Sequence, residues 1–157
     1  MTPAIAVLKS VKADFELLKY GHNDQVSDYG NEASDNLGVD KAHIFKCLMV
    51  EFDSTQYGVA LVPVSTQLNT KKLLKLTAYK KVNMLAAAEI KKVSGYIAGG
   101  VSPFGQKRPY RTFVDSSIVP LKEVYVSAGK RGCAIKISSE QLLKYTAAIQ
   151  GDIAAND

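Results

Sequence analysis

The chain has 157 residues, an apolar fraction of 46% and a net charge of +5 at pH 7. This length and composition suit one compact globular domain. No uncharged apolar run approaches the roughly 18 residues of a membrane-spanning helix, and the N-terminal stretch is not expected to be a secretory leader. Two cysteines do not make a disulfide framework. The sequence therefore predicts a single cytoplasmic domain over residues 1–157.

Helix start and stop signals predict five helices. Thr2 followed by Pro3 is typical of a helix start, and Gly38 supplies the left-handed conformation that ends a helix. Ser138 and Gln141 have the spacing of a capping box. The helices are expected over residues 2–12, 31–37, 71–77, 85–93 and 138–148.

Apolar and β-branched runs between turn-prone segments predict the strands. They are expected over residues 14–20, 43–52, 57–64, 112–118, 123–129 and 133–137. Strands dominate the middle of the chain, while helices occupy its two ends and one insertion. This order predicts a mixed α/β (α+β-like) single domain, in which helices flank a curved mixed β-sheet or barrel.

Positive charge is concentrated in one segment. Residues 71–131 hold thirteen Lys or Arg against three Asp or Glu, whereas residues 1–70 hold five against nine. Such a segment attracts nucleic acid, although solvated lysines on amphipathic helices give the same pattern. Tyr96, Phe104 and Tyr110 lie in this segment and could stack on an exposed base, but aromatic residues more commonly pack in the core.

Lys46 is out of place in its predicted strand. Period-two alternation puts it on the same face as Ile44, Leu48 and Val50. Because burying an unpaired ammonium is costly, this pattern indicates an anion-binding lysine in a cleft. A lysine that reaches water from an edge strand explains the pattern equally well.

The cysteines are better interpreted as small buried hydrophobes than as catalytic thiols. Cys47 points away from Lys46, and only a fold that brings His22 or His43 close would give it a base. Neither C-x-x-C nor H-x-x-x-H spacing occurs, so no metal site is expected.

Two glycine-rich segments are candidates for ligand binding. Gly100 and Gly105 have Walker-loop separation, but Gln106 stands where that loop needs lysine, which argues against a nucleoside triphosphate. The backbone N–H groups of this loop could face an anion or a carbonyl oxygen, or its glycines could only serve tight turns. The second segment, GKRG at residues 129–132, suits either a hairpin turn or a phosphate-binding rim.

Three ordered motifs together resemble the YbaK/EbsC family of Cys-tRNA(Pro) deacylases, relatives of the editing domain in bacterial prolyl-tRNA synthetases. They are FKCL at residues 45–48, GGVSPFGQ at 99–106 and VSAGKRG at 126–132. The opening of the chain, through Tyr20 and His22, is also similar. The resemblance implies a barrel-like mixed sheet with flanking helices. It also implies a pocket, with no cofactor, for the 3′-terminal adenosine of tRNA and its ester-linked amino acid.

The resemblance implies roles for individual residues. Lys46 matches the family's essential lysine, which orients the substrate and is here the predicted catalytic residue. The loop from Gly99 and the turn from Gly129 match walls of the pocket. The predicted substrate-binding residues are Tyr20, Gly99, Gly100, Ser102, Pro103, Gly105, Gly129, Lys130 and Arg131.

The family chemistry implied by the resemblance uses no protein nucleophile. The thiol of the substrate cysteine attacks its own ester and releases a cyclic thiolactone, which agrees with the lack of a Ser-His-Asp or Cys-His pattern in this sequence. The partners implied are aminoacylated tRNA, above all tRNA(Pro), and prolyl-tRNA synthetase.

Two positions depart from the family pattern. Cys47 stands where threonine is more common, and Ala134 stands where the family has aspartate. A deacylase for another small amino acid, such as alanine, and a non-catalytic module that binds tRNA or a synthetase therefore stay open as alternatives.

Overall fold

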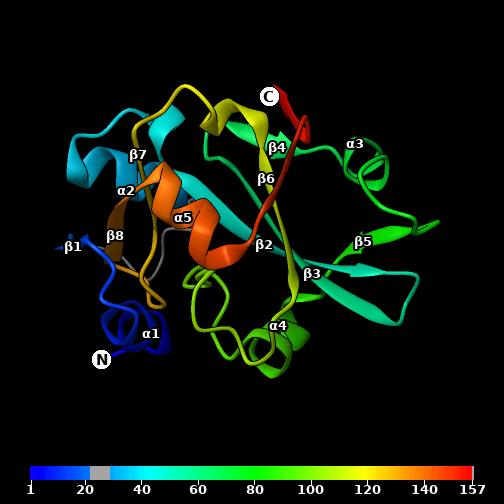
Figure 1. Ribbon diagram of the computed structural model, residues 1–157, viewed down its shortest axis with the longest axis horizontal. Coiled ribbons are helices and arrows are strands. Elements are labelled where there is room, and N and C mark those ends of the chain that lie inside the picture. Colours follow the sequence, from blue (N-terminus) through cyan, green and yellow to red (C-terminus); the bar gives the residue numbers. More distant parts are fainter. Residues whose placement is uncertain (22–28, 157) are drawn as a thin grey trace.

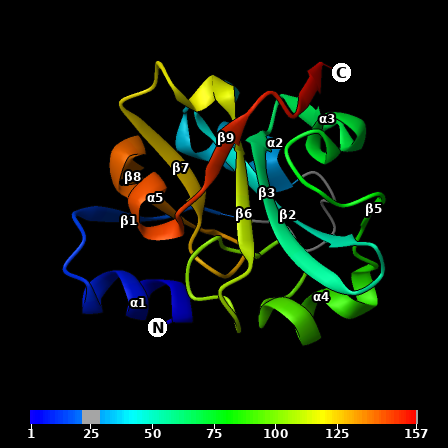
Figure 2. The ribbon, with the colours of Figure 1, turned by 45° about the vertical axis from the view of Figure 1, so that its right-hand side comes forward.

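The computed structural model describes residues 1–21 and 29–156, so the predictions for His22 lie outside the described residues. Its helices are α1 (Pro3–Ser10), α2 (Tyr29–Leu37), α3 (Thr70–Leu74), α4 (Ala87–Ser94) and α5 (Ser139–Thr146), with 3-10 turns η1 (Lys41–His43) and η2 (Ser116–Ile118). Its strands are β1 (Phe15–Lys19), β2 (Phe45–Phe52), β3 (Gln56–Pro63), β4 (Thr66–Leu68), β5 (Val82–Met84), β6 (Arg111–Asp115), β7 (Glu123–Ser127), β8 (Cys133–Ser138), β9 (Ile149–Gly151) and β10 (Ala154–Asn156). In Figures 1 and 2, α1 and α4 lie at one end and α3 at the other.

The predicted helix signals act as expected. The Thr2 hydroxyl accepts a hydrogen bond from the Ile5 N–H, and the Ser138 hydroxyl accepts one from the Gln141 N–H. Gly38, with φ of +67°, follows α2. The helix predicted over 71–77 is shorter, and the strand predicted over 112–118 ends early because η2 begins there.

The strands form open sheets. The larger sheet has the order β5-β2-β3-β6-β9, with parallel β3–β6 and β6–β9 pairs. The smaller, antiparallel sheet has the order β1-β8-β7, and β10 pairs with β4. A parallel bridge between Ile44 and Tyr125 joins the two main sheets. The mixed α/β prediction is confirmed, but the barrel alternative is not, because the strands in the described part of the chain do not close.

Two apolar clusters lie on opposite faces of β2. Phe45 and Met49 belong to one cluster, with residues of α1, β7 and β8. Val50 and Phe52 belong to the other, which includes Phe113 of β6. The alternation predicted for this strand is therefore present, and it fixes the sides to which neighbouring residues point.

Asp115 ties the C-terminal segment to β6. Its carboxylate accepts hydrogen bonds from the Ile153 and Ala154 N–H groups, both at 3.0 Å, and from the Ser117 N–H. Burial alone would raise the pKa of Asp115, but hydrogen bonding by the Ser117 side chain, together with these N–H groups, outweighs it and lowers the pKa. The charged form is therefore favoured in the folded state.

Asp115→Ala is expected to lower the free energy of unfolding at pH 7 by about 2–4 kcal/mol, because it leaves buried N–H groups without their acceptor. The folded pKa lies below the unfolded value of about 3.9, so the charge-dependent part is present above that value. It is lost as pH falls through the folded pKa.

Urea unfolding as a function of pH measures this effect. Asp152→Ala is the control, because it breaks only a surface ion pair with Lys72 and should cost less than about 1 kcal/mol. Equal costs for the two variants, or an Asp115→Ala cost that does not shrink in acid, would contradict the assignment.

Candidate active site

The pocket lies at a break in the sheet along one edge of β2. At one end of the break, Ile44 bridges to Tyr125 of β7. At the other end, the Met49 carbonyl accepts a hydrogen bond from the Leu85 N–H, and the ladder with β5 begins at Val50. Between these points, among the described residues, β2 has a strand partner on its other edge only, and that partner is β3. Because backbone groups alternate between strand edges, the N–H and C=O of Cys47 face the break.

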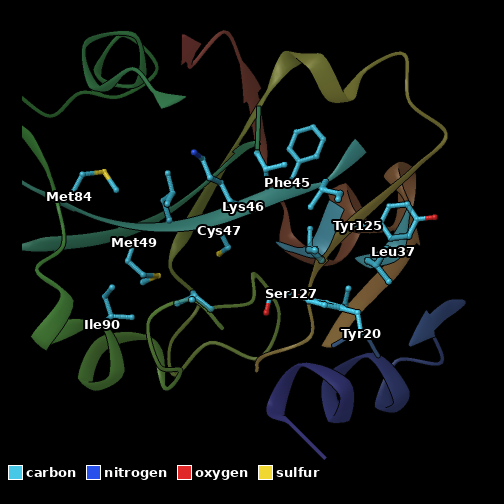
Figure 3. A pocket seen from close by; sticks show the side chains of 18 of the residues that line it. Tyr20, Leu37, Phe45, Lys46, Cys47, Met49, Met84, Ile90, Tyr125 and Ser127 are labelled. Carbon is cyan, nitrogen blue, oxygen red and sulfur yellow. The ribbon is translucent and has the colours of Figure 1, made fainter. Parts of the chain in front are cut away.

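A cavity of about 380 Å³ occupies this break. Its walls come from β2, the end of β1, α2, β5, α4, the loop after α4, and β7 with β8 (Figure 3). The lining residues are Tyr20, Ala33, Leu37, Ile44, Phe45, Lys46, Cys47, Leu48, Met49, Val64, Met84, Leu85, Ile90, Gly99, Val101, Tyr125, Val126, Ser127 and Ala134. Among the described residues of this lining, Lys46 is the only charged side chain.

Lys46 and Cys47 leave β2 on opposite sides (Figure 3). Both line the cavity, because the cavity extends around the strand edge. The side of Lys46 is that of Leu48 and Val50, as predicted. The edge-strand alternative is correct only locally: β2 is an inner strand of its sheet, but at Lys46 one of its edges carries no ladder partner in the described chain.

The two thiols are poor nucleophiles. Burial raises the pKa of the Cys47 thiol well above its ordinary value, and burial also raises the pKa of Cys133. His43, in η1, is exposed and does not line the cavity. None of the described lining residues is His, Asp or Glu, so neither Cys47 nor Ser127 meets an imidazole or a carboxylate in this wall.

Tyr20 closes the side of the cavity opposite β5. Its backbone N–H donates to the Gly132 carbonyl at 2.9 Å, which fixes the end of β1 on the β7–β8 turn. Burial is the largest cause of a raised pKa for its hydroxyl, and the carboxylate of Glu32 adds to the rise. The hydroxyl therefore stays protonated at neutral pH and can donate a hydrogen bond.

The glycine loop contributes only part of its length to this cavity. Gly99, with φ of +84°, lines the cavity, whereas Gly100 packs on the backbone of Lys130 and Arg131. Ser102 is fully buried. Pro103 and Gly105 line a separate cavity of about 520 Å³.

The GKRG turn lies behind the pocket wall. Gly129, with φ of +104°, packs against Tyr96 and Thr2. Lys130 is exposed and borders a third cavity of about 170 Å³, whereas Arg131 pairs with Glu32. The structure thus brings Tyr20, Lys46 and Gly99 together, and it places the other predicted substrate-binding residues outside the cavity lining.

The aromatic residues of the basic segment are mostly packed against other parts of the protein. Tyr96 and Phe104 are buried, and the Tyr96 hydroxyl donates to the Phe104 carbonyl at 2.6 Å. The half-buried Tyr110 donates its hydroxyl to the Val93 carbonyl at 2.7 Å. Base stacking on Tyr96 and Phe104 is therefore excluded without rearrangement.

Sequence reasoning missed most apolar walls of the pocket. Met84 lies on the three-residue strand β5, which is too short to show a period. Leu37 and Ile90 look like ordinary helix residues in the sequence. Ser127 lies inside the VSAGKRG motif, so that motif was the signal that could have identified it.

Comparison with known proteins identifies the family. The sequence profile of the aminoacyl-tRNA editing domain matches residues 24–145. The chain belongs to the aminoacyl-tRNA editing domain family. Editing domains act on aminoacyl-tRNA, so the resemblance and the enzyme class predicted from the sequence, an aminoacyl-tRNA deacylase, are confirmed.

Relatives of this editing domain cover most of its length. EbsC of Enterococcus faecalis, provisionally named a Cys-tRNA(Pro)/Cys-tRNA(Cys) deacylase, is 37% identical over 113 residues, covering 72% of this chain and 69% of EbsC. The uncharacterised YwhH of Bacillus subtilis is 23% identical over 145 residues, covering 88% of this chain and 90% of YwhH.

A solved structure shares the fold. A protein provisionally described as a trans-editing enzyme for prolyl-tRNA synthetase has a TM-score of 0.87 at 19% identity, covering 98% of this chain and 96% of that one. At this identity the likeness shows the fold alone. Within the described residues, no helix has the length and apolarity to cross a membrane.

Proposed function

We propose that this editing domain, spanning residues 1–157, clears mischarged Cys-tRNA(Pro) in trans in the cytoplasm. The observation that carries the proposal is the composition of the pocket: one lysine beside the main chain of Cys47, with no His, Asp or Glu among the described lining residues. A volume of about 380 Å³ is at the small end of ligand sites, which suits an aminoacyl ester on a terminal ribose.

The proposed chemistry uses the substrate's own sulfur. The cysteine thiol loses its proton and, as the thiolate, attacks its own ester carbonyl carbon; the bond from that carbon to the ribose oxygen breaks, and that oxygen takes up a proton. The products are a cyclic thiolactone and deacylated tRNA. The protein then has only to orient the ester and stabilise the oxyanion.

Lys46 is proposed to hold the substrate for this attack, with Tyr20 and the Gly99 loop as further walls. Alignment of reacting groups can contribute about 7–11 kcal/mol in favourable cases. One well-placed donor to the oxyanion typically contributes about 3 kcal/mol. We propose the ammonium of Lys46 and the main-chain N–H of Cys47 as the donors.

The pocket walls favour a substrate whose amino acid has a small, uncharged side chain. Cys47, Met49 and Ile90 form an apolar surface below β2 (Figure 3). Ala134 adds another apolar contact where the family has a carboxylate. An alanyl ester therefore stays the alternative substrate, because an apolar pocket distinguishes two substrates by only about 1–3 kcal/mol for each methylene by which they differ.

The proposed partners are tRNA(Pro) and prolyl-tRNA synthetase. The names of EbsC and of the similar solved structure support them, and EbsC's name extends the substrate to Cys-tRNA(Cys). The basic segment 71–131 supports a polyanionic partner.

The test is deacylation of cysteinyl, seryl, alanyl and prolyl esters of tRNA(Pro), with and without prolyl-tRNA synthetase. Loss of the cysteinyl ester alone is expected. Faster loss of the alanyl ester would reassign the substrate. If every ester persists even with the synthetase present, the chain is better explained as a non-catalytic module that binds tRNA or the synthetase.

A further inference from the structure

A buried ion pair crosses from α2 to the β7–β8 turn. The Arg131 Nε lies 3.2 Å from Glu32 Oε1, and its Nη2 lies 3.2 Å from Glu32 Oε2. Their side chains are only 13% and 6% exposed. A two-pronged pair of this kind fixes orientation. Because removing both charges from water is costly, a buried ion pair is weak evidence for a gain in net stability.

The ion pair holds a wall of the proposed active site. Glu32 lies in the first turn of α2, and Ala33 and Leu37 of that helix line the cavity. Two other side-chain hydrogen bonds of α2 are local: Ser34 donates to the Val39 carbonyl and Asn36 to that of Glu32. The pair is thus a long-range polar tie between α2 and the sheets.

The same turn contacts two further walls. The Gly132 carbonyl accepts from the Tyr20 N–H. Gly100 packs so closely that an added Cβ would lie 3.0 Å from Lys130 Cα and 3.1 Å from the Arg131 N. Gly99, its neighbour, lines the cavity. Helix α2, Tyr20 and the glycine loop are therefore positioned by one four-residue turn.

We propose that Arg131 is a positioning residue: through Glu32 it holds α2 against the pocket and sets α2 in register with Tyr20 and the Gly99 loop. The proposal rests on the proposed deacylase function. It replaces the expectation that Arg131 belongs to a phosphate-binding rim, because its guanidinium is buried against a carboxylate.

Charge exchange tests this role. Glu32→Arg and Arg131→Glu are each expected to lower kcat for deacylation about 10- to 100-fold, since a wall displaced by about 1 Å has an effect of this size. The double exchange should recover kcat to within about threefold of the wild type. Glu123→Ala, which breaks the surface pair with Lys136, is the control and should keep full activity.

The readouts separate this role from phosphate binding and from simple unfolding. Amide hydrogen exchange of residues 32–37 should quicken in both single variants and slow again in the double exchange, with the melting temperature measured beside it. A loss confined to KM, largest at low salt and not rescued by exchange, would mean phosphate contact and overturn the proposal. So would single variants with wild-type kcat and unchanged exchange.

Failure of the proposed function would look different. The wild type would then hydrolyse no ester, while hydrogen exchange would still report whether the ion pair holds α2. Unchanged exchange in the single variants would overturn the positioning role in that case as well.

Discussion

Lys46→Ala is expected to lower kcat/KM for deacylation about 100- to 1000-fold, the usual effect of removing one donor from an oxyanion site. Lys46 is the only charged side chain among the described residues of the pocket lining. The melting temperature should stay close to that of the wild type, because Lys46 is half-buried and belongs to neither apolar cluster.

The control for Lys46 is Lys12→Ala. Lys12 is exposed, follows α1, and lies outside both the pocket lining and the basic segment 71–131, so this variant removes the same charge from the molecule without touching the site. Single-turnover deacylation compares the two. If Lys46→Ala deacylates the tRNA as fast as Lys12→Ala, Lys46 has no part in the mechanism.

Gly105→Ala is expected to lower the free energy of unfolding by about 2–5 kcal/mol. With φ of +66°, Gly105 adopts a left-handed conformation that costs other residues about 1–2 kcal/mol. An added Cβ would also lie 2.6 Å from the Pro3 carbonyl carbon, and overpacking of this kind costs about 1–3 kcal/mol more. Because the contact is with backbone, no side-chain rotation relieves it.

Gly38→Ala separates the two contributions. Gly38 has φ of +67°, but no heavy atom lies within 4 Å of its added Cβ. Urea unfolding should therefore show only the conformational cost of about 1–2 kcal/mol. Equal losses at the two glycines would show that the contact between the glycine loop and α1 is not tight.

Local features were predictable because local interactions cause them. The caps at Thr2 and Ser138 and the alternation along β2 depend on residues a few positions apart. The break in the sheet depends instead on the Ile44–Tyr125 bridge and on where β5 begins to pair, and neither leaves a pattern in the sequence.

Sequence reasoning had no access to distant contacts. Gly105 and Gly129 lie in motifs that resemble a substrate loop, yet each glycine also lies too close to other groups for a Cβ. Arg131 looks like a phosphate-binding cation until the fold brings Glu32, 99 residues away in sequence, into contact with it. Such pairings follow from topology rather than from composition.

The central claim is that the substrate's thiol carries out the chemistry in a pocket that only orients it. The most direct measurement compares deacylation of Cys-tRNA(Pro) with that of Ser-tRNA(Pro), in which an oxygen replaces the sulfur. Rapid loss of the cysteinyl ester and persistence of the seryl ester is the expected result. Loss of both esters at similar rates would mean that another nucleophile attacks, and it would contradict the claim.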